Sequence, residues 1–198
     1  MNGKVIMLTG APATGKSSLA RLLKTKQSNL ESIDYGKLLL LEKQKTIPNL
    51  TYDELRKRSA DLITAQDVAD MDDKLIEWVR DNRRQAHILI DTHGVTKEDF
   101  GFRLTPFVYT QVVELRFDAI FSLYCDPNSI QERIGRDPKG RPQITIEEAL
   151  MHSQLQNGIA SLYGVLSGYP VFFLDSSCSL DELCQTALKI LKIEVQIT

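Results

Sequence analysis

Several short segments of the chain are apolar at nearly every position, and longer segments between them carry apolar residues at helical spacing. Continuous apolar runs are typical of strands that are buried on both faces, as in a parallel sheet covered by helices. The pattern predicts strands over residues 4–8, 86–91, 118–125 and 170–175, with a weaker one over 30–34. Regular alternation of strands with helices predicts an α/β fold, a three-layer sandwich around a five-stranded parallel sheet.

Helices are expected between these strands, and several have recognisable start signals. Asp126 followed by Pro127 is typical of a helix start, and Pro106 is expected to open another helix. Thr145 with Glu148 resembles a capping box. The remaining helical segments are 17–26, the long stretch 52–82, the segment from Thr145 to about Leu166, and 180–193. Segments 35–62 and 135–144 interrupt the alternation where a parallel sheet presents its ligand-facing edge.

Composition fits one compact domain over residues 1–198, with 42% hydrophobic and 25% charged residues. A formal charge of −2 argues against a nucleic-acid coat or a basic membrane surface. Cys125, Cys178 and Cys184 have no C-x-x-C spacing, so free thiols in a reducing compartment are expected. No apolar run is long enough for a membrane helix, and the first strand leaves no room for a signal peptide, so a cytoplasmic location is expected.

A glycine-rich turn follows the first predicted strand and fits the P-loop pattern G-x-x-x-x-G-K-[ST]. Glycines allow close backbone approach, and the amide groups of such a turn form a nest for anionic oxygens. The positive N-terminal end of the next helix adds to this attraction. Lys16 would reach the β- and γ-phosphates of ATP, and the Ser17 hydroxyl suits Mg²⁺. The predicted ATP-binding residues are Gly10, Ala11, Pro12, Ala13, Thr14, Gly15, Lys16, Ser17 and Ser18.

A carboxylate ends the third predicted strand, at Asp91 in ILIDTH. In P-loop proteins an acid at this place holds Mg²⁺, so Ser17 and Asp91 are the predicted metal residues. Strands also end in Asp for reasons of turn geometry, and the P-loop favours the functional interpretation. His93, two residues further, either donates to a phosphate or caps the loop.

Two arginine-bearing segments flank the expected site. In the first, 35–62, Arg56 can form a bidentate pair with an acceptor phosphate, although composition alone favours a solvated helix face. The second, 135–144, follows Arg133 and carries Arg136, Lys139 and Arg141 on a turn-rich segment with glycine hinges. Such a segment suits a lid that closes over polyphosphate. With no guanine-reading N-K-x-D motif, these segments favour a small kinase.

The chain resembles the archaeal-type adenylate kinases of the P-loop nucleoside monophosphate kinase group. The resemblance extends over roughly residues 5–175. It rests on VIMLTGAPATGKSS at 5–18, IDYGK at 33–37, DELRK at 53–57, ILIDTH at 88–93, ERIGR at 132–136 and YGVLSG at 163–168.

This resemblance implies the reaction Mg-ATP + AMP = 2 ADP, with Mg²⁺ as cofactor and small-molecule nucleotides as partners. It implies an acceptor-binding region at about 35–62 and a lid at about 135–144. Family members are often trimers, so a homo-oligomer is an open expectation. The catalytic residues expected are Lys16, Arg133, Arg136 and Arg141, and those expected at the acceptor are Asp34, Tyr35, Gly36, Arg56, His93 and Arg103.

Two departures from the family pattern keep alternatives open. Asn157 stands where the family has an arginine, and a lost cation there would slow transfer or change the acceptor. Segment 97–106 also differs and carries Arg103, which replaces the missing charge or reflects another acceptor. One alternative is a kinase for another nucleotide or for an alcohol, with Asp34 or Asp91 as base. The other is an ATP-binding regulatory module with weak ATPase activity.

Overall fold

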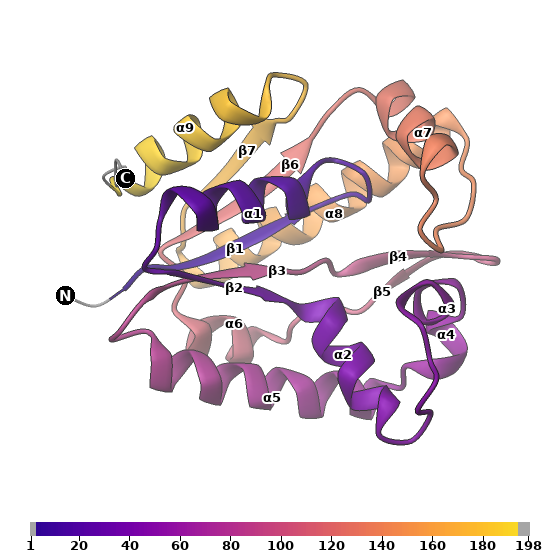
Figure 1. Ribbon diagram of the computed structural model, residues 1–198, viewed down its shortest axis with the longest axis horizontal. Coiled ribbons are helices and arrows are strands. Elements are labelled where there is room, and N and C mark those ends of the chain that lie inside the picture. The colour runs from indigo at the N-terminus through magenta and orange to yellow at the C-terminus, as the bar shows by residue number, and fades with distance from the viewer. Residues whose placement is uncertain (1–2, 194–198) are drawn as a thin grey trace.

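Residues 3–193 are described by a computed structural model, and their centre is a five-stranded parallel sheet with helices on both faces (Figure 1). The strand order is β2-β3-β1-β6-β7. The strands are β1 (Val5–Gly10), β2 (Leu30–Asp34), β3 (His87–Asp91), β6 (Ala119–Tyr124) and β7 (Val171–Asp175). Four of them were predicted from their apolar runs and β2 as a weaker candidate, and the α/β sandwich is confirmed.

Alternate residues of the central strand pack against different helix layers. Ile6 and Leu8 face a core shared with α1 (Lys16–Lys26) and α9 (Leu180–Leu191), above the sheet in Figure 1. Val5 and Met7 face the opposite core. The helices of that second layer are α2 (Tyr35–Gln44), α5 (Ala65–Asn82), α6 (Tyr109–Leu115) and α8 (Ile146–Ser167). Continuous apolar strands are thus explained by burial on both sides.

The remaining elements gather at the carboxyl ends of the strands (Figure 1). They are α3 (Tyr52–Lys57), α4 (Ser59–Leu62), α7 (Pro127–Arg136) and an antiparallel hairpin of β4 (Val95–Glu98) and β5 (Gly101–Leu104). The predicted helical stretch 52–82 is therefore three helices, because Arg58 leaves the helical conformation and Ile63 is extended. Thr64 then caps α5 through a reciprocal capping box with Asp67.

The expectation that Pro106 opens a helix is wrong. Helix α6 begins at Tyr109, and the extended Val108 is its N-cap. The chain before it is the hairpin, which occupies most of segment 97–106. Its two strands are only four residues long and mix polar with apolar residues, so no clear period marked them.

The segment 135–144 begins in the last turn of α7 and continues without regular structure from residue 137. It lies against α3, since a Cβ at Gly140 would come within 2.4 Å of the Asp53 backbone. Gly140 also has a φ of +73°, which favours glycine. This contact brings the predicted lid beside the predicted acceptor region.

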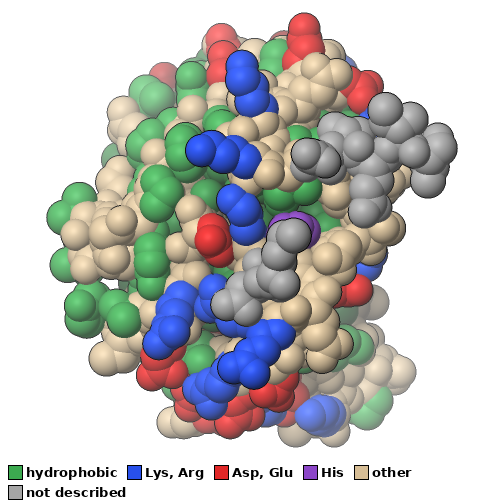
Figure 2. All heavy atoms as spheres, turned by 90° about the vertical axis from the view of Figure 1, so that its left-hand side faces the viewer, with side chains coloured by type: hydrophobic (Ala, Val, Ile, Leu, Met, Phe, Trp, Pro, Cys, Tyr) green, Lys and Arg blue, Asp and Glu red, His purple; other side chains and the backbone are tan. Residues whose placement is uncertain are grey.

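The opposite end of the molecule, where the strands begin, has a mixed surface. Figure 2 shows basic and acidic side chains close together on this face, with apolar side chains along one flank. No helix within residues 3–193 combines the length and apolar character needed to cross a membrane.

Candidate active site

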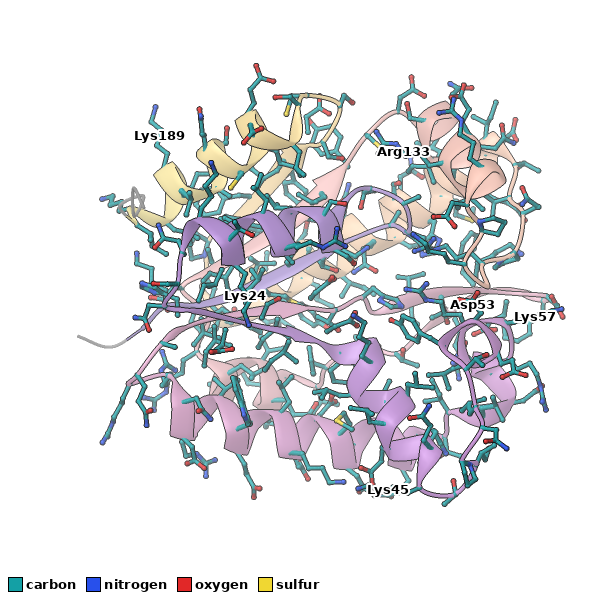
Figure 3. The ribbon with its side chains drawn as sticks, viewed as in Figure 1. Lys24, Lys45, Asp53, Lys57, Arg133 and Lys189 are labelled. Carbon is teal, nitrogen blue, oxygen red and sulfur yellow. The ribbon has the colours of Figure 1, made fainter. Side chains whose placement is uncertain are left out.

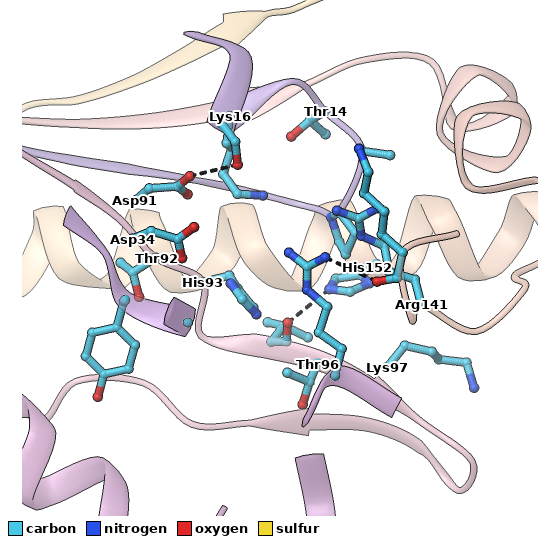
Figure 4. A pocket seen from close by; sticks show the side chains of 18 of the residues that line it. Thr14, Lys16, Asp34, Asp91, Thr92, His93, Thr96, Lys97, Arg141 and His152 are labelled. Carbon is cyan, nitrogen blue, oxygen red and sulfur yellow. Dashed lines mark hydrogen bonds between the residues drawn. The ribbon is translucent and has the colours of Figure 1, made fainter. Parts of the chain in front are cut away.

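A cavity of about 1020 Å³ lies at the carboxyl edge of the sheet. The P-loop, the ends of β2 and β3, helix α3, the β4–β5 hairpin and the lid segment all contribute to its lining. Figure 4 shows Lys16, Asp34, Asp91 and His93 around a common space, which Arg141 approaches from another side. The volume suits a small-molecule ligand.

The P-loop is shaped by close packing against the sheet. Gly10 has a φ of +141°, and a Cβ there would come within 2.5 Å of the Leu123 carbonyl oxygen. Thr14 is fully buried, and its hydroxyl donates to the Ala11 carbonyl at 2.8 Å. The loop is therefore held by contacts within the protein.

The first turn of α1 is open to an anion. Gly15 is its N-cap and provides no side-chain hydrogen bond, and no acidic residue lies in the first turn. By contrast, Thr64, Thr145 and Ser179 cap α5, α8 and α9 with side-chain oxygens. Unpaired N–H groups and the helix dipole together favour phosphate at such a terminus.

Lys16 lies inside the P-loop rather than in solvent. Its Nζ donates to the carbonyl oxygens of Gly10 at 2.7 Å and Ala11 at 3.0 Å. Burial lowers the pKa of Lys16 to about 8; Asp91 opposes this decrease, whereas the charges of Arg141 and Arg56 add to it. These three cations therefore act on the same space, where an anion would relieve their repulsion.

Ser17 and Asp91 contact each other, as their predicted metal role requires. The Ser17 hydroxyl donates to Asp91 Oδ2 at 3.1 Å, and Asp91 is 8% exposed. Burial raises the pKa of Asp91, and the charge of Lys16 opposes this increase. Within residues 3–193 no cluster of three His, Cys, Asp or Glu side chains exists to hold a metal alone. One carboxylate and one hydroxyl fit Mg²⁺ that is bound jointly by the protein, water and phosphate oxygens.

A second carboxylate, Asp34, faces the cavity from the neighbouring strand. Asp34 pairs in register with Asp91 across β2 and β3. Its Oδ1 caps α2 through the Lys37 N–H and also accepts from the Tyr52 hydroxyl at 3.3 Å. Both hydrogen bonds orient this carboxylate at the cavity wall.

Five predicted arginines line the cavity, and their environments differ. Arg56 stacks 3.9 Å from the centre of the Tyr52 ring and donates to the Lys139 carbonyl at 3.2 Å, which links α3 to the lid. Arg133 donates to the Ala13 carbonyl at 3.0 Å. Figure 3 shows Arg133 next to the P-loop, whereas Lys45 and Lys189 lie at the outer surface.

Two more of these arginines come from the end of α7 and from the lid. Arg136 pairs with Glu132 and is largely exposed. Arg141 donates to Pro138 at 3.4 Å, and burial, followed by the charge of Arg56, lowers its pKa. Arg141 is thus oriented with Arg56 toward the cavity, whereas Arg136 lies at its rim.

Two histidines line the cavity in neutral form. Burial lowers the pKa of His93 to about 3, and the charge of Lys16 adds to this effect. His152 of α8 is 2% exposed, and its Nε2 lies 3.1 Å from the Val95 carbonyl oxygen. Burial lowers the pKa of His152 to about 4. Both rings therefore present uncharged polar groups near neutral pH.

The buried His152 gives a pH dependence of stability. Below pH 6.5 His152 is protonated in the unfolded chain, whereas in the folded protein it stays neutral down to about pH 4. The free energy of unfolding therefore decreases as the pH falls through this window. Between pH 7 and pH 5 the wild type should lose about 2 kcal/mol more than His152→Gln. Urea unfolding of both proteins at the two pH values measures this difference, and equal losses would contradict it.

Arg103 lies at the cavity but is held by neighbours. Its Nε is 3.4 Å from Glu98 Oε1, and its guanidinium donates to the Ile63 carbonyl and the Ser59 hydroxyl. The carboxylate of Glu98 is buried beside it. Arg103 therefore joins the hairpin to α4, and part of its charge is compensated within the protein.

The expected site residues are brought together with few exceptions. Every predicted acceptor, metal and catalytic residue lines the cavity, whereas Gly10 and Ala11 lie behind the rest of the P-loop. Residues that were not predicted as site residues also line it, from α5, the hairpin, the segment before α6, α8 and the turn after β7: Asp72, Thr96, Lys97, Phe107, His152, Tyr163 and Cys178. Asp72 had a signal, because an acid stands there within the apolar stripe of α5.

Asn157 does not lie in the cavity lining. It accepts a hydrogen bond from the Ser122 hydroxyl at 2.8 Å. The neighbouring Gln156 is fully buried and donates to Thr9 at 2.8 Å. The feature that favoured a weakly active module is thus a packing contact between α8 and β6.

Sequence comparison finds relatives over nearly the full length. The chain is 26% identical over 196 residues to the adenylate kinase of Pyrococcus abyssi, covering 97% of each chain. It is also 26% identical to the adenylate kinase of Pyrococcus furiosus, covering 96% of each. The resemblance to archaeal adenylate kinases is thereby confirmed.

Comparison of structures supports the same architecture. Shikimate kinase from Acinetobacter baumannii, solved in complex with shikimate, aligns with a TM-score of 0.58 over 96% of this chain and 93% of that one, at 17% identity. At this identity the likeness shows the fold, which is that of a P-loop kinase. The family model described as "AAA domain" matches residues 9–149, which include the P-loop, Asp91 and the α7 arginines. The chain belongs to this AAA domain family.

Proposed function

We propose that the protein transfers the γ-phosphoryl group of Mg-ATP to a nucleoside monophosphate, with AMP as the acceptor. The observation that carries this proposal is one cavity in which an open P-loop and an arginine-bearing acceptor wall face each other. The archaeal adenylate kinases that the chain resembles support AMP as the acceptor. The other partners would be small-molecule nucleotides.

Phosphoryl transfer to a nucleoside monophosphate depends on positioning of the reactants and on stabilising charge more than on a general base. An acceptor phosphate oxygen is already anionic near neutral pH, so it attacks the γ-phosphorus without losing a proton. The bond from this phosphorus to the β–γ bridging oxygen breaks, and the charge returns to the β-phosphate of ADP. Lys16 and the P-loop amides would hold the donor phosphates, and Arg56 and Arg141 would hold the two phosphates in line.

Ser17 and Asp91 are the residues that would hold Mg²⁺. Bound there, the ion would neutralise charge on the phosphate oxygens during transfer. Neutral His93, with a pKa of about 3, provides a polar ring near Lys16 without adding a charge. The lid segment would exclude water and so limit hydrolysis of ATP.

The proposal predicts a selective acceptor defect for Arg56→Ala. Arg56 already spans α3 and the lid, where an acceptor phosphate would replace its contact with Lys139. kcat/KM for AMP should fall by about 10- to 100-fold, mainly through KM, with little change in ATP affinity. Arg58→Ala is the matched control, since the Arg58 side chain is exposed and pairs with the exposed Asp61. An equal loss of ATP affinity would count against an acceptor role.

A panel of acceptors tests the function itself. ADP formation from Mg-ATP would be followed with AMP, CMP, UMP, shikimate and simple alcohols, and with no acceptor. Fast ADP formation that requires AMP supports the proposal. Hydrolysis at one rate regardless of acceptor would favour an ATP-binding module.

The oriented carboxylate of Asp34 favours one further candidate, a kinase for an alcohol acceptor. Such an acceptor needs a base, and Asp34 reaches the cavity with its geometry fixed by Tyr52. Product from an alcohol, abolished in Asp34→Asn, would support this candidate over the nucleotide.

A further inference from the structure

The cavity has an aromatic floor formed by Tyr35, Phe107 and Tyr163. The Tyr35 and Phe107 rings meet edge-on with centroids 5.8 Å apart, and the centroids of Phe107 and Tyr163 lie 6.3 Å apart. Apolar side chains complete this part of the lining: Leu39, Ile63 and Val68. Flat, partly apolar rings such as nucleobases fit walls of this kind.

One carboxyl group lies in the aromatic floor. Asp72 of α5 lines the cavity and is 2% exposed. Its Oδ1 accepts a 2.5 Å hydrogen bond from the Tyr35 hydroxyl. Among residues 3–193, no lysine, arginine or histidine forms an ion pair with Asp72. A buried carboxylate without a cation is costly, and burial raises the pKa of Asp72 to about 6.

The simplest structural role for Asp72 would be to satisfy Tyr35. However, the Tyr35 hydroxyl also lies 3.3 Å from the Val68 carbonyl oxygen, which is an acceptor independent of Asp72. An apolar residue at position 72 would therefore leave the hydroxyl with a partner. The hydrogen bond to Tyr35 therefore does not explain why a carboxyl group is buried at position 72, at a cost in free energy.

The remaining capacity of Asp72 points to a ligand. Tyr35 and the Gln111 side chain are neutral donors to this carboxylate. A carboxylate has about four lone-pair positions for hydrogen bonds, so two neutral donors leave room for another. An N–H on the edge of a nucleobase fits this position, because the aromatic floor suits the flat ring and the carboxylate accepts the hydrogen bond.

We propose that Asp72 selects the acceptor nucleotide by accepting a hydrogen bond from the exocyclic amino group of its base. This inference rests on the proposed function and adds to it a specificity-determining residue. The base would lie on the aromatic floor, with its phosphate directed toward Lys16. A base without an amino group would leave the buried carboxylate without this partner, and such mismatches strongly reduce affinity.

A single-group comparison tests the proposal. AMP and purine riboside 5′-monophosphate differ only in the amino group at C6. Their kcat/KM values and their dissociation constants from calorimetry would be measured for the wild-type protein. We expect AMP to be preferred by at least about tenfold in both measurements, as for loss of a hydrogen bond to a charged group.

Two variants identify the residue responsible. Asp72→Asn is nearly isosteric and still offers an oxygen to Tyr35, which turns its NH₂ toward the cavity. Its preference for AMP should fall to within about twofold. Asp73→Asn removes an acidic charge from the adjacent, exposed position of the same helix and should keep the preference.

The possible failures can be separated. If the wild type uses both nucleotides equally, or if Asp72→Asn keeps the AMP preference, the role of Asp72 is rejected while the kinase proposal stands. If the wild type neither binds nor phosphorylates any nucleoside monophosphate, both proposals fail. The wild-type comparison needs no variant, so poor folding of Asp72→Asn would not prevent a decision.

Discussion

Lys16→Ala should lower kcat/KM for ATP by about 10³-fold, as is typical when a charge that stabilises a transferring phosphoryl group is removed. The Lys16 ammonium is the group in the described P-loop that can follow charge from the γ-phosphate to the product. It already contacts two loop carbonyls, at Gly10 and Ala11, so its position is set before ATP arrives. Steady-state kinetics with varied ATP measure the loss in kcat/KM, and calorimetry measures how much of it comes from weaker ATP binding.

Lys24→Ala is the matched control for Lys16. Both lysines belong to α1, but Lys24 forms an exposed surface pair with Glu31 at 3.3 Å. Exposed pairs contribute little to stability, so Lys24→Ala should behave as the wild type. ATP affinity and turnover that survive in Lys16→Ala would contradict phosphate binding at the P-loop.

Asp91→Asn should lower kcat by about 10²-fold and raise the Mg²⁺ concentration needed for half-maximal activity by about tenfold. Asparagine keeps an oxygen that can accept from the Ser17 hydroxyl, so the loss reports on the negative charge. The affinity for Mn²⁺ in the presence of a non-hydrolysable ATP analogue gives a readout that does not depend on turnover, and it should fall in parallel.

Asp175 offers a control at an equivalent place in the sheet. It also ends a parallel strand, but its carboxylate caps a turn through the Ser177 N–H and lies outside the cavity lining. Asp175→Asn should leave the metal requirement unchanged. If Asp91→Asn bound Mn²⁺ as the wild type does, Asp91 would have only a structural role with Ser17.

The sheet was predictable because its signal is strong and local. Runs such as residues 5–8 and 88–90 are buried on both faces, and no surface requirement interrupts their apolar pattern. The β4–β5 hairpin was missed for the opposite reason. Its strands pair only with each other, and Glu98 is buried because Arg103 and Ser59 lie beside it. No local pattern in the sequence indicates this tertiary contact of Glu98 with Arg103 and Ser59.

The residues of the candidate site likewise divide into those that the sequence predicts and those that it does not. The P-loop residues were found because the chemistry fixes both residue types and their spacing. Asp72 and His152 could not be found by spacing, since they reach the cavity from helices whose faces are decided by packing. Asn157, a departure from the family pattern noted in the sequence, contacts Ser122 and lies outside the cavity lining, which order along the chain could not indicate.

The central claim is that one cavity transfers a phosphoryl group between two nucleotides. The most direct measurement follows ATP labelled at its γ-phosphorus during incubation with Mg²⁺ and AMP. The account predicts that label appears in the β-phosphate of newly formed ADP, at a rate that depends on AMP. Release of the label as inorganic phosphate at the same rate with and without AMP would contradict it.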